Sequence, residues 1–377
     1  MRRQDRERLI ELRKRLHRHP ELSGHEAETA RIVSKFIHSC MPDTIVRGLG
    51  GNGIACIFKA KRPGLTVAFR CELDALPVEE KNPFSHRSKS PKISHACGHD
   101  GHMAILAGLG MRLAQHRPQR GRVVLLFQPA EETGEGAGSM IEDSRFRDIQ
   151  PDSIFALHNL PGHPLGRVLI REGSFNCASR GMIIKLRGVS SHAAYPEKGR
   201  SPAQALAEII ESLPGLPDGG EGLSRVTIVH ARLGEKAFGT APGYAEVMAT
   251  LRSQDEGSME RLVQRAEDLT GETGERHGLD VEISWSDVFS TTLNHPEAVD
   301  LVERAGSACG MTIEKTEAPF RWSEDFGRFL ACYQGALFCM GAGENHAPLH
   351  SPHYDFPDDL IEPGVTLFEQ IVRDILG

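Results

Sequence analysis

The chain has no long apolar run. No stretch of its 377 residues approaches the roughly 18 apolar residues that a membrane-spanning helix requires. Its start, Met1 to Arg6, is charged and lacks the apolar core of a secretory signal. We therefore expect a cytoplasmic protein that neither spans a membrane nor is exported.

Blocks of basic residues are also absent, and the net charge at pH 7 is −7. Proteins that bind nucleic acid or an anionic membrane surface use clustered lysine and arginine for that purpose. This balance argues against both partners and favours small-molecule chemistry.

Paired cysteines are lacking as well. The 8 cysteines stand at positions 40, 56, 71, 97, 177, 309, 332 and 339. These positions show neither the spacing of a zinc ribbon nor that of a disulfide framework, which fits a reducing compartment.

Metal-binding residue types are instead concentrated in two short segments. Residues 94–102 read Ser-His-Ala-Cys-Gly-His-Asp-Gly-His, and the apolar run 123–127 is followed by Gln-Pro-Ala-Glu-Glu. Thiolate and imidazole bind borderline divalent metals, and glycines let the backbone approach an ion closely. A carboxylate that binds metal is a poor proton carrier, so the adjacent glutamates can divide the work. The pattern predicts a hydrolytic metal site containing Cys97 and His99, with Glu132 as ligand and Glu131 as general base, or the reverse.

Apolar periodicity predicts an α/β fold. Short apolar runs at 54–58, 65–69, 122–127 and 154–157 alternate with helical patterns such as 102–116, which predicts a mostly parallel central sheet with helices on both faces. Ser23 to Glu26 resembles a capping box that opens a helix. At 377 residues the chain is long enough for two domains.

The element order changes in the middle of the chain. Strand, helix, strand, strand, helix and strand are predicted in turn between residues 175 and 289, the order of a ferredoxin-like unit. We therefore expect a discontinuous metal-binding domain, 1–174 and 290–377, with a ferredoxin-like lid or dimerisation domain inserted at 175–289.

Candidate polar groups follow the predicted strands. Ligands of open α/β sheets bind beyond the carboxyl ends of the strands. Asp74 follows the run that ends at Phe69, the glutamates follow Phe127, and His158 follows Leu157. We expect these groups to converge at one edge of the sheet.

With these motifs in view, the chain resembles the M20 metallopeptidase family, in particular its amidohydrolase branch of N-acyl-amino-acid, hippurate and auxin-conjugate hydrolases. The resemblance extends from His17-Arg18-His19-Pro20-Glu21-Leu22-Ser23 to His350-Ser351-Pro352-His353-Tyr354-Asp355-Phe356, nearly the whole chain. It implies an aminopeptidase-like catalytic domain. It also implies two divalent ions, of manganese, zinc, nickel or cobalt, held by Cys97, His99, Glu132, His158 and His350.

The same resemblance assigns roles to further residues. It implies that Glu131 is the general base and that Asp74, in Glu-Leu-Asp-Ala-Leu-Pro, orients the metal site. His192, in Gly-Val-Ser-Ser-His-Ala-Ala, resembles a histidine presented to the substrate, often in a partner subunit's site. Arg252 resembles an arginine that binds the substrate carboxylate. Gly239 departs from the family, since many relatives have asparagine there.

The expected reaction is hydrolysis of an N-acyl amino acid by a metal-activated water, in a homodimer or higher homo-oligomer. Two alternatives remain open. A dinuclear dipeptidase or exopeptidase would cleave unblocked peptides and lose activity on N-acylation. A metal-binding relative without catalysis ranks last, because the candidate base Glu131 is present.

Overall fold

The computed structural model describes residues 1–217 and 222–377. These residues form two compact units, each described by itself. The first contains Met1–Phe175, Thr292–Pro319 and Asp325–Gly377, and the second contains Asn176–Thr291 and Phe320–Glu324. No helix formed by the described residues is long and apolar enough to cross a membrane.

An eight-stranded sheet forms the centre of the first unit, as far as the chain is described, in the order β1-β2-β4-β3-β5-β16-β6-β15. Its strands are β1 (Thr44–Leu49), β2 (Gly53–Lys59), β3 (Arg62–Glu72), β4 (Arg120–Gln128), β5 (Ser153–Leu160), β6 (Val168–Ile170), β15 (Ile313–Lys315) and β16 (Gln334–Gly341). The four central strands β4, β3, β5 and β16 are parallel. Antiparallel pairs stand nearer the edges, so the sheet is mixed.

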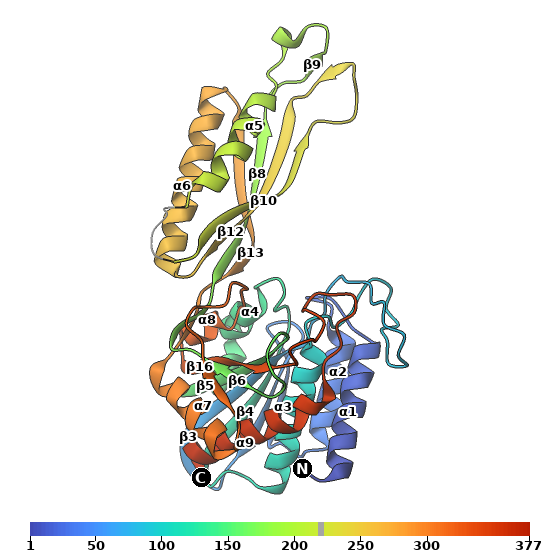
Figure 1. Cartoon of the computed structure of the whole chain (residues 1–377), viewed down its shortest axis with the longest axis vertical. Coiled ribbons are helices and arrows are strands. Elements are labelled where there is room, and N and C mark those ends of the chain that lie inside the picture. Colours follow the sequence, from blue (N-terminus) through green and yellow to red (C-terminus); the bar gives the residue numbers. More distant parts are fainter. Residues whose placement is uncertain (218–221) are drawn as a thin grey trace. The chain divides into compact units, whose positions relative to one another are not determined.

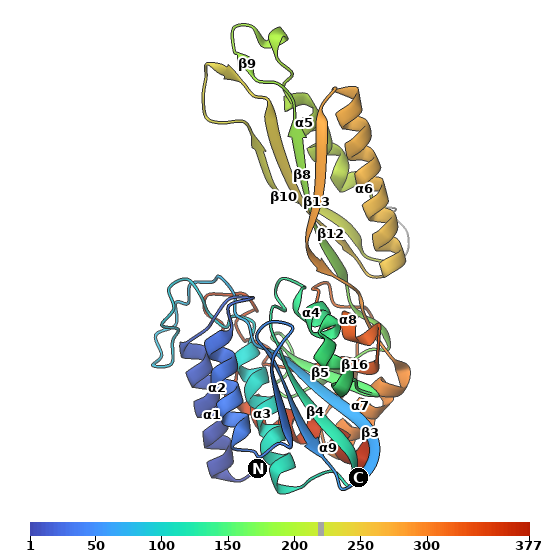
Figure 2. The ribbon, with the colours of Figure 1, turned by 180° about the vertical axis from the view of Figure 1, so that it is seen from behind.

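Helices cover both faces of this sheet, which confirms the predicted α/β class. They are α1 (Arg3–Arg18), α2 (Ala27–His38), α3 (His99–Gln115), α4 (Gly136–Glu142), α7 (Pro296–Ala308), α8 (Gly327–Leu330) and α9 (Ile361–Leu376). Helices α3 and α9 lie in front of the sheet in Figure 1, and α4 lies on the opposite face in Figure 2. The short strands β7 (Gly173–Asn176) and β14 (Thr292–Asn294) pair separately.

The core of the first unit lies between the sheet and its helices. Strands β2 and β4 are buried over most of their length, because helices cover both faces, and they read as apolar runs for the same reason. Helix α3 is buried almost throughout. Its glycines permit close packing, since a Cβ at Gly108 would lie 2.4 Å from Val365 Cγ2. The strand ends that carry the polar candidates are therefore held by a rigid framework.

The second unit has the ferredoxin-like element order. It contains β8 (Ala178–Arg187), α5 (Ala203–Ser212), β10 (Ser224–Leu233), β12 (Tyr244–Ser253), α6 (Glu256–Arg276) and β13 (Asp280–Phe289). The strands form an antiparallel sheet in the order β10-β12-β8-β13. Alternate residues of β12 are buried, which is the period of a sheet with one covered face. Helices α5 and α6 cover that face (Figure 1).

The predicted capping box at residues 23–26 is wrong. Helix α2 begins at Ala27, and neither Ser23 nor Glu26 caps it; the Glu21 carboxylate accepts from the first-turn N–H groups of Glu28 and Thr29 at 3.3 and 2.7 Å. Ser23 Oγ instead donates to Asp74 Oδ2 at 2.7 Å, and Glu26 Oε1 accepts from the Ala130 N–H at 2.8 Å. Ser23 and Glu26 therefore bond to residues that are distant in the sequence, and both of these bonds lead to the segments that carry the candidate metal site.

Candidate metal centre

The structure brings the five predicted metal ligands together in the first unit. Cys97, His99 and His158 form one group in which a ligand atom of each lies within 4.8 Å of the others. Cys97, Glu132 and His350 form a second such group, and His99, Glu131 and Glu132 form a third. Cys97 lies in the loop just before α3, His99 is the first residue of α3, and His158 belongs to β5. His158 lies inside the strand rather than after it, because β5 continues to Leu160.

His99 carries the clearest indication of a cation. Its Nδ1 lies 2.9 Å from the carbonyl oxygen of Asp74, so this nitrogen donates and the neutral ring has its lone pair on Nε2. Nε2 is buried and has no hydrogen-bond partner among the described residues. The carboxylates of Glu131 and Glu132 face it at 3.9 and 3.8 Å. A lone pair opposed by two carboxylates is favourable only when a proton or a metal ion lies between them.

The electrostatics of His99 agree with this geometry. Burial alone would lower its pKa, but the Asp74 carboxylate, whose Oδ1 lies 3.5 Å from Nδ1, and the charges of Glu72 and Glu132 raise the pKa to about 10. The carboxylates that stabilise a proton on this nitrogen would also stabilise a metal cation there. A proton and a divalent ion therefore compete for Nε2.

His158 offers a neutral imidazole nitrogen as a potential metal ligand. Its buried surroundings and the neighbouring His102 hold its pKa well below the ordinary value, so the ring is neutral. Its Nδ1 donates to the carbonyl oxygen of Asn159 at 2.7 Å. Nε2 then carries the lone pair and lies 3.4 Å from Cys97 Sγ. Neutral imidazole beside a cysteine sulfur is a donor set that suits zinc, cobalt and nickel.

The two glutamates differ in what they face. Glu132 Oε1 points toward His99, and its Oε2 lies 3.9 Å from His350 Nε2. Its backbone N–H donates to Asp74 Oδ2 at 2.9 Å. Glu131 is more deeply buried and approaches His99 with one oxygen. A carboxylate that faces two histidines is the better placed to bind metal.

Backbone strain accompanies the cluster. Ala130, directly before the glutamates, has φ 49°, and His350 has φ 64°, conformations that are uncommon for residues with a side chain. Such conformations persist only where the surrounding structure enforces them, and they are frequent at functional sites. The Ala130 carbonyl accepts from Gly136 N at 3.0 Å, which closes the turn that presents Glu131 and Glu132.

His192 and Arg252 belong to the second unit, and their contribution to the metal site stays a prediction. His192 ends the short strand β9 (Ser191–His192), paired with β11 (Thr240–Ala241), and is exposed. Its Nδ1 accepts from Ala194 N at 3.0 Å, so the neutral ring carries its proton on Nε2. Arg252 Nη1 donates to the Arg321 carbonyl and to Ser323 Oγ, both at 3.0 Å. Burial lowers the pKa of Arg252, and this guanidinium forms no ion pair with a described carboxylate.

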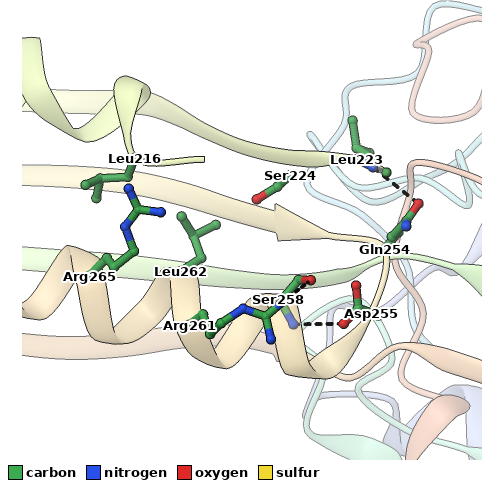
Figure 3. Close-up of a pocket in the computed structure, with 10 residues that line it drawn as sticks. Leu216, Leu223, Ser224, Gln254, Asp255, Ser258, Arg261, Leu262 and Arg265 are labelled. Carbon is green, nitrogen blue, oxygen red and sulfur yellow. Dashed lines mark hydrogen bonds between the residues drawn. The ribbon is translucent and has the colours of Figure 1, made fainter. Parts of the chain in front are cut away.

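A pocket lies in the second unit, at the start of α6 (Figure 3). Its polar groups bond to one another: Ser258 N donates to Asp255 Oδ1 at 2.8 Å, and Leu223 N donates to Gln254 Oε1 at 3.2 Å. None of the described residues that line it is a predicted ligand or base. It is not the site of the predicted chemistry.

Sequence reasoning missed several residues that support the cluster. Ser23 holds Asp74, and the Glu72 carboxylate accepts from His102 Nδ1 at 2.7 Å. Asn159 and Tyr354 bond to each other beside Cys97 and are both buried. Only long-range contacts reveal these roles, because each partner is distant in the sequence.

Comparison with known proteins identifies the family. The model of peptidase family M20/M25/M40 matches residues 68–374. The chain belongs to this family. Its members are metal-dependent hydrolases, which is the class of this protein and agrees with the ligand cluster.

Individual relatives cover nearly the whole chain. An uncharacterized hydrolase of Staphylococcus haemolyticus is 29% identical over 372 residues, 96% of each chain. The Bacillus subtilis YXEP protein, described as a dinuclear metal binding peptidase from the M20 family, superposes with a TM-score of 0.83 at 24% identity, covering 100% of this chain and 99% of that one. An aminobenzoyl-glutamate utilization protein of Klebsiella pneumoniae gives 0.77 at 21% identity, covering 99% and 96%. These two structures confirm the fold.

Proposed function

We propose that this M20 hydrolase cleaves the amide bond of N-acyl amino acids or related amino-acid conjugates, with Glu131 as general base. The arrangement of Glu131 and Glu132 around one imidazole nitrogen is the observation that carries the proposal. Their oxygens lie 3.9 and 3.8 Å from His99 Nε2. One carboxylate can therefore bind the metal, while the other stays close enough to accept a proton from a water bound to that metal.

The donor set fits two divalent ions of manganese, zinc, nickel or cobalt. Cys97, His99, Glu132, His158 and His350 would hold them, and the bound ions would acidify a water and polarise the acyl oxygen. Glu131 would take the proton of that water and pass it to the leaving amine. Asp74 would orient His99, because its carbonyl oxygen already accepts from His99 Nδ1 at 2.9 Å.

Two residues of the second unit support the proposed substrate class. Arg252 is a partly buried cation without an ion-pair partner among the described residues, which suits a substrate carboxylate. His192 presents an Nε2–H donor, which suits the oxyanion of a tetrahedral intermediate. The Klebsiella relative is named for aminobenzoyl-glutamate, which is itself an N-acyl amino acid.

A paired substrate panel tests the proposal. Each N-acyl amino acid is assayed beside the free dipeptide with the same C-terminal residue, with each of the four candidate metals. We expect hydrolysis of acylated substrates and kcat/KM at least about tenfold lower for free dipeptides, because a free α-ammonium group must be desolvated beside bound cations. Arg252→Lys should raise KM for the acylated substrates, since lysine cannot bind a carboxylate in the bidentate manner.

The opposite preference would establish the alternative, a dinuclear dipeptidase or exopeptidase. The description of the Bacillus relative as a peptidase makes this the second candidate. Absence of hydrolysis throughout the panel, in protein that has bound metal, would favour a metal-binding relative without catalysis.

We further propose a homodimer in which His192 of each chain completes the partner's site. Catalysis then depends on assembly. Co-expressed Glu131→Gln and His192→Ala chains, each inactive alone, should recover part of the activity, because one site of the hybrid combines an intact base with an intact histidine. A purified hybrid dimer that stays inactive would mean that His192 acts within its own chain.

A further inference from the structure

Asn159 lies at the centre of the ligand-bearing segments, although it is not a predicted ligand. It follows His158 in β5 and is fully buried. Each polar group of its side chain is engaged by the protein. A buried amide that is fully hydrogen-bonded resists displacement, because every broken bond leaves a desolvated polar group behind.

The bonds of Asn159 reach two of the candidate ligands directly. Its Nδ2 donates to the carbonyl oxygen of Cys97 at 2.7 Å. Its backbone carbonyl oxygen accepts from His158 Nδ1 at 2.7 Å and so directs the other ring nitrogen toward the cysteine sulfur. One residue thus holds the backbone of Cys97 and the ring of His158, whose ligand atoms lie 3.4 Å apart.

His102 determines which way the Asn159 amide faces. His102 Nδ1 donates to Glu72 Oε2 at 2.7 Å, and its Nε2 accepts from the Asn159 backbone N–H at 3.0 Å. Asn159 Nδ2 also lies 3.0 Å from that nitrogen. The amide nitrogen therefore faces two acceptors, the His102 ring and the Cys97 carbonyl, and a flipped amide would place its oxygen against both.

Tyr354 and Gly98 complete the arrangement. The Tyr354 hydroxyl donates to Asn159 Oδ1, and Tyr354 lies in the loop that carries His350. The His350 backbone N–H in turn donates to Ala96 O at 2.8 Å. Gly98 has φ 88°, and a Cβ there would lie 2.4 Å from Asn159 Nδ2. Glycine at this position is what allows the asparagine to approach the Cys97 carbonyl.

We propose that Asn159 is a positioning residue that sets the separation of Cys97 and His158 and thereby the metal affinity and ligand geometry of the site. The inference rests on the proposed metal ligands but not on the proposed substrate. Residues that hydrogen-bond to metal ligands typically change metal affinity 10- to 100-fold when they are replaced.

Cobalt binding to the full-length protein tests this role without any substrate. Metal-free wild type, Asn159→Ala and Asn159→Asp are titrated with Co²⁺ against a chelator, and the thiolate-to-cobalt charge-transfer band is recorded. We expect both variants to bind at least about tenfold more weakly and to show a shifted or weakened band. The aspartate variant keeps the size of the side chain but loses both amide donors.

Asn294→Ala is the matched control. Asn294 is also a buried asparagine, and among the described residues its side chain bonds only to backbone groups of Arg171 and Leu337. Its replacement should destabilise the fold without moving the cobalt band. Tyr354→Phe removes a single bond to Asn159, and it should shift the band in the same direction even if neither Asn159 variant folds.

The outcomes distinguish failure of the proposed metal site from failure of the proposed role of Asn159. Wild-type protein that shows no thiolate–cobalt band would overturn the proposed metal site itself. If wild type shows the band but folded Asn159 variants match Asn294→Ala in affinity and spectrum, this inference is wrong. An unchanged band in Tyr354→Phe would contradict it when the Asn159 variants do not fold.

Discussion

Glu131→Gln should lower kcat by about 100- to 10,000-fold, the contribution that general acid–base catalysis typically makes. Glutamine keeps the shape of the side chain but cannot accept the proton of a water. Because Glu132 rather than Glu131 faces both His99 and His350, metal content should stay unchanged. KM should change little, since the proton transfer is made in the transition state and not in substrate binding.

Glu132→Gln should produce the opposite pattern, with metal lost together with activity. Glu135→Gln is the matched control, because Glu135 is exposed on the same turn and is not a candidate ligand. Its kcat should stay within about twofold of wild type, as for surface substitutions in general. If Glu131→Gln loses metal while Glu132→Gln keeps metal and loses only kcat, the two roles are reversed.

Replacing two ligands on the same segment should have a comparably large effect. Cys97→Ser combined with His99→Ala removes a sulfur from the loop before α3 and an imidazole from its first residue, and both atoms belong to one candidate group. We expect elemental analysis to find metal binding abolished and hydrolysis at background. Ligands that act as a unit are not additive, so either single variant should already lose most of the activity.

Cys332→Ser combined with His38→Ala is the control for this double variant. Both residues are exposed, so the same residue types are changed away from the cluster. Metal content and activity should stay at wild-type values. Unchanged metal binding in the Cys97/His99 double variant would refute the proposed ligand set.

The elements that could be predicted from the sequence are those with strong local patterns. The apolar run before Gln128 marked β4, and the run before His158 marked β5, because buried strands are continuously apolar. The ends of these elements were less accurate. Helix α3 begins at His99 rather than His102, since Gly98 in a left-handed conformation opens the helix three residues earlier. The start at His99 places that ligand on the first turn of the helix.

The supporting residues of the site could not be predicted because their partners are distant in the chain. Ser23 and Glu26 have the spacing of a local cap, but a hydroxyl bonds as well to a tertiary acceptor, here Asp74. Asn159 appears in the sequence as one polar residue near the end of an apolar strand. Its bond to Cys97 spans 62 positions and exists only in the folded chain.

The most direct test of the central claim is a metal titration of wild-type protein. Metal-free protein is prepared with a chelator, and bound ions and hydrolysis of an N-acyl amino acid are then measured together as metal is added. We expect no hydrolysis without metal, two ions per chain at saturation and activity that returns as the sites fill. Full activity in metal-free protein, or binding that saturates at one ion per chain, would contradict a dinuclear amidohydrolase.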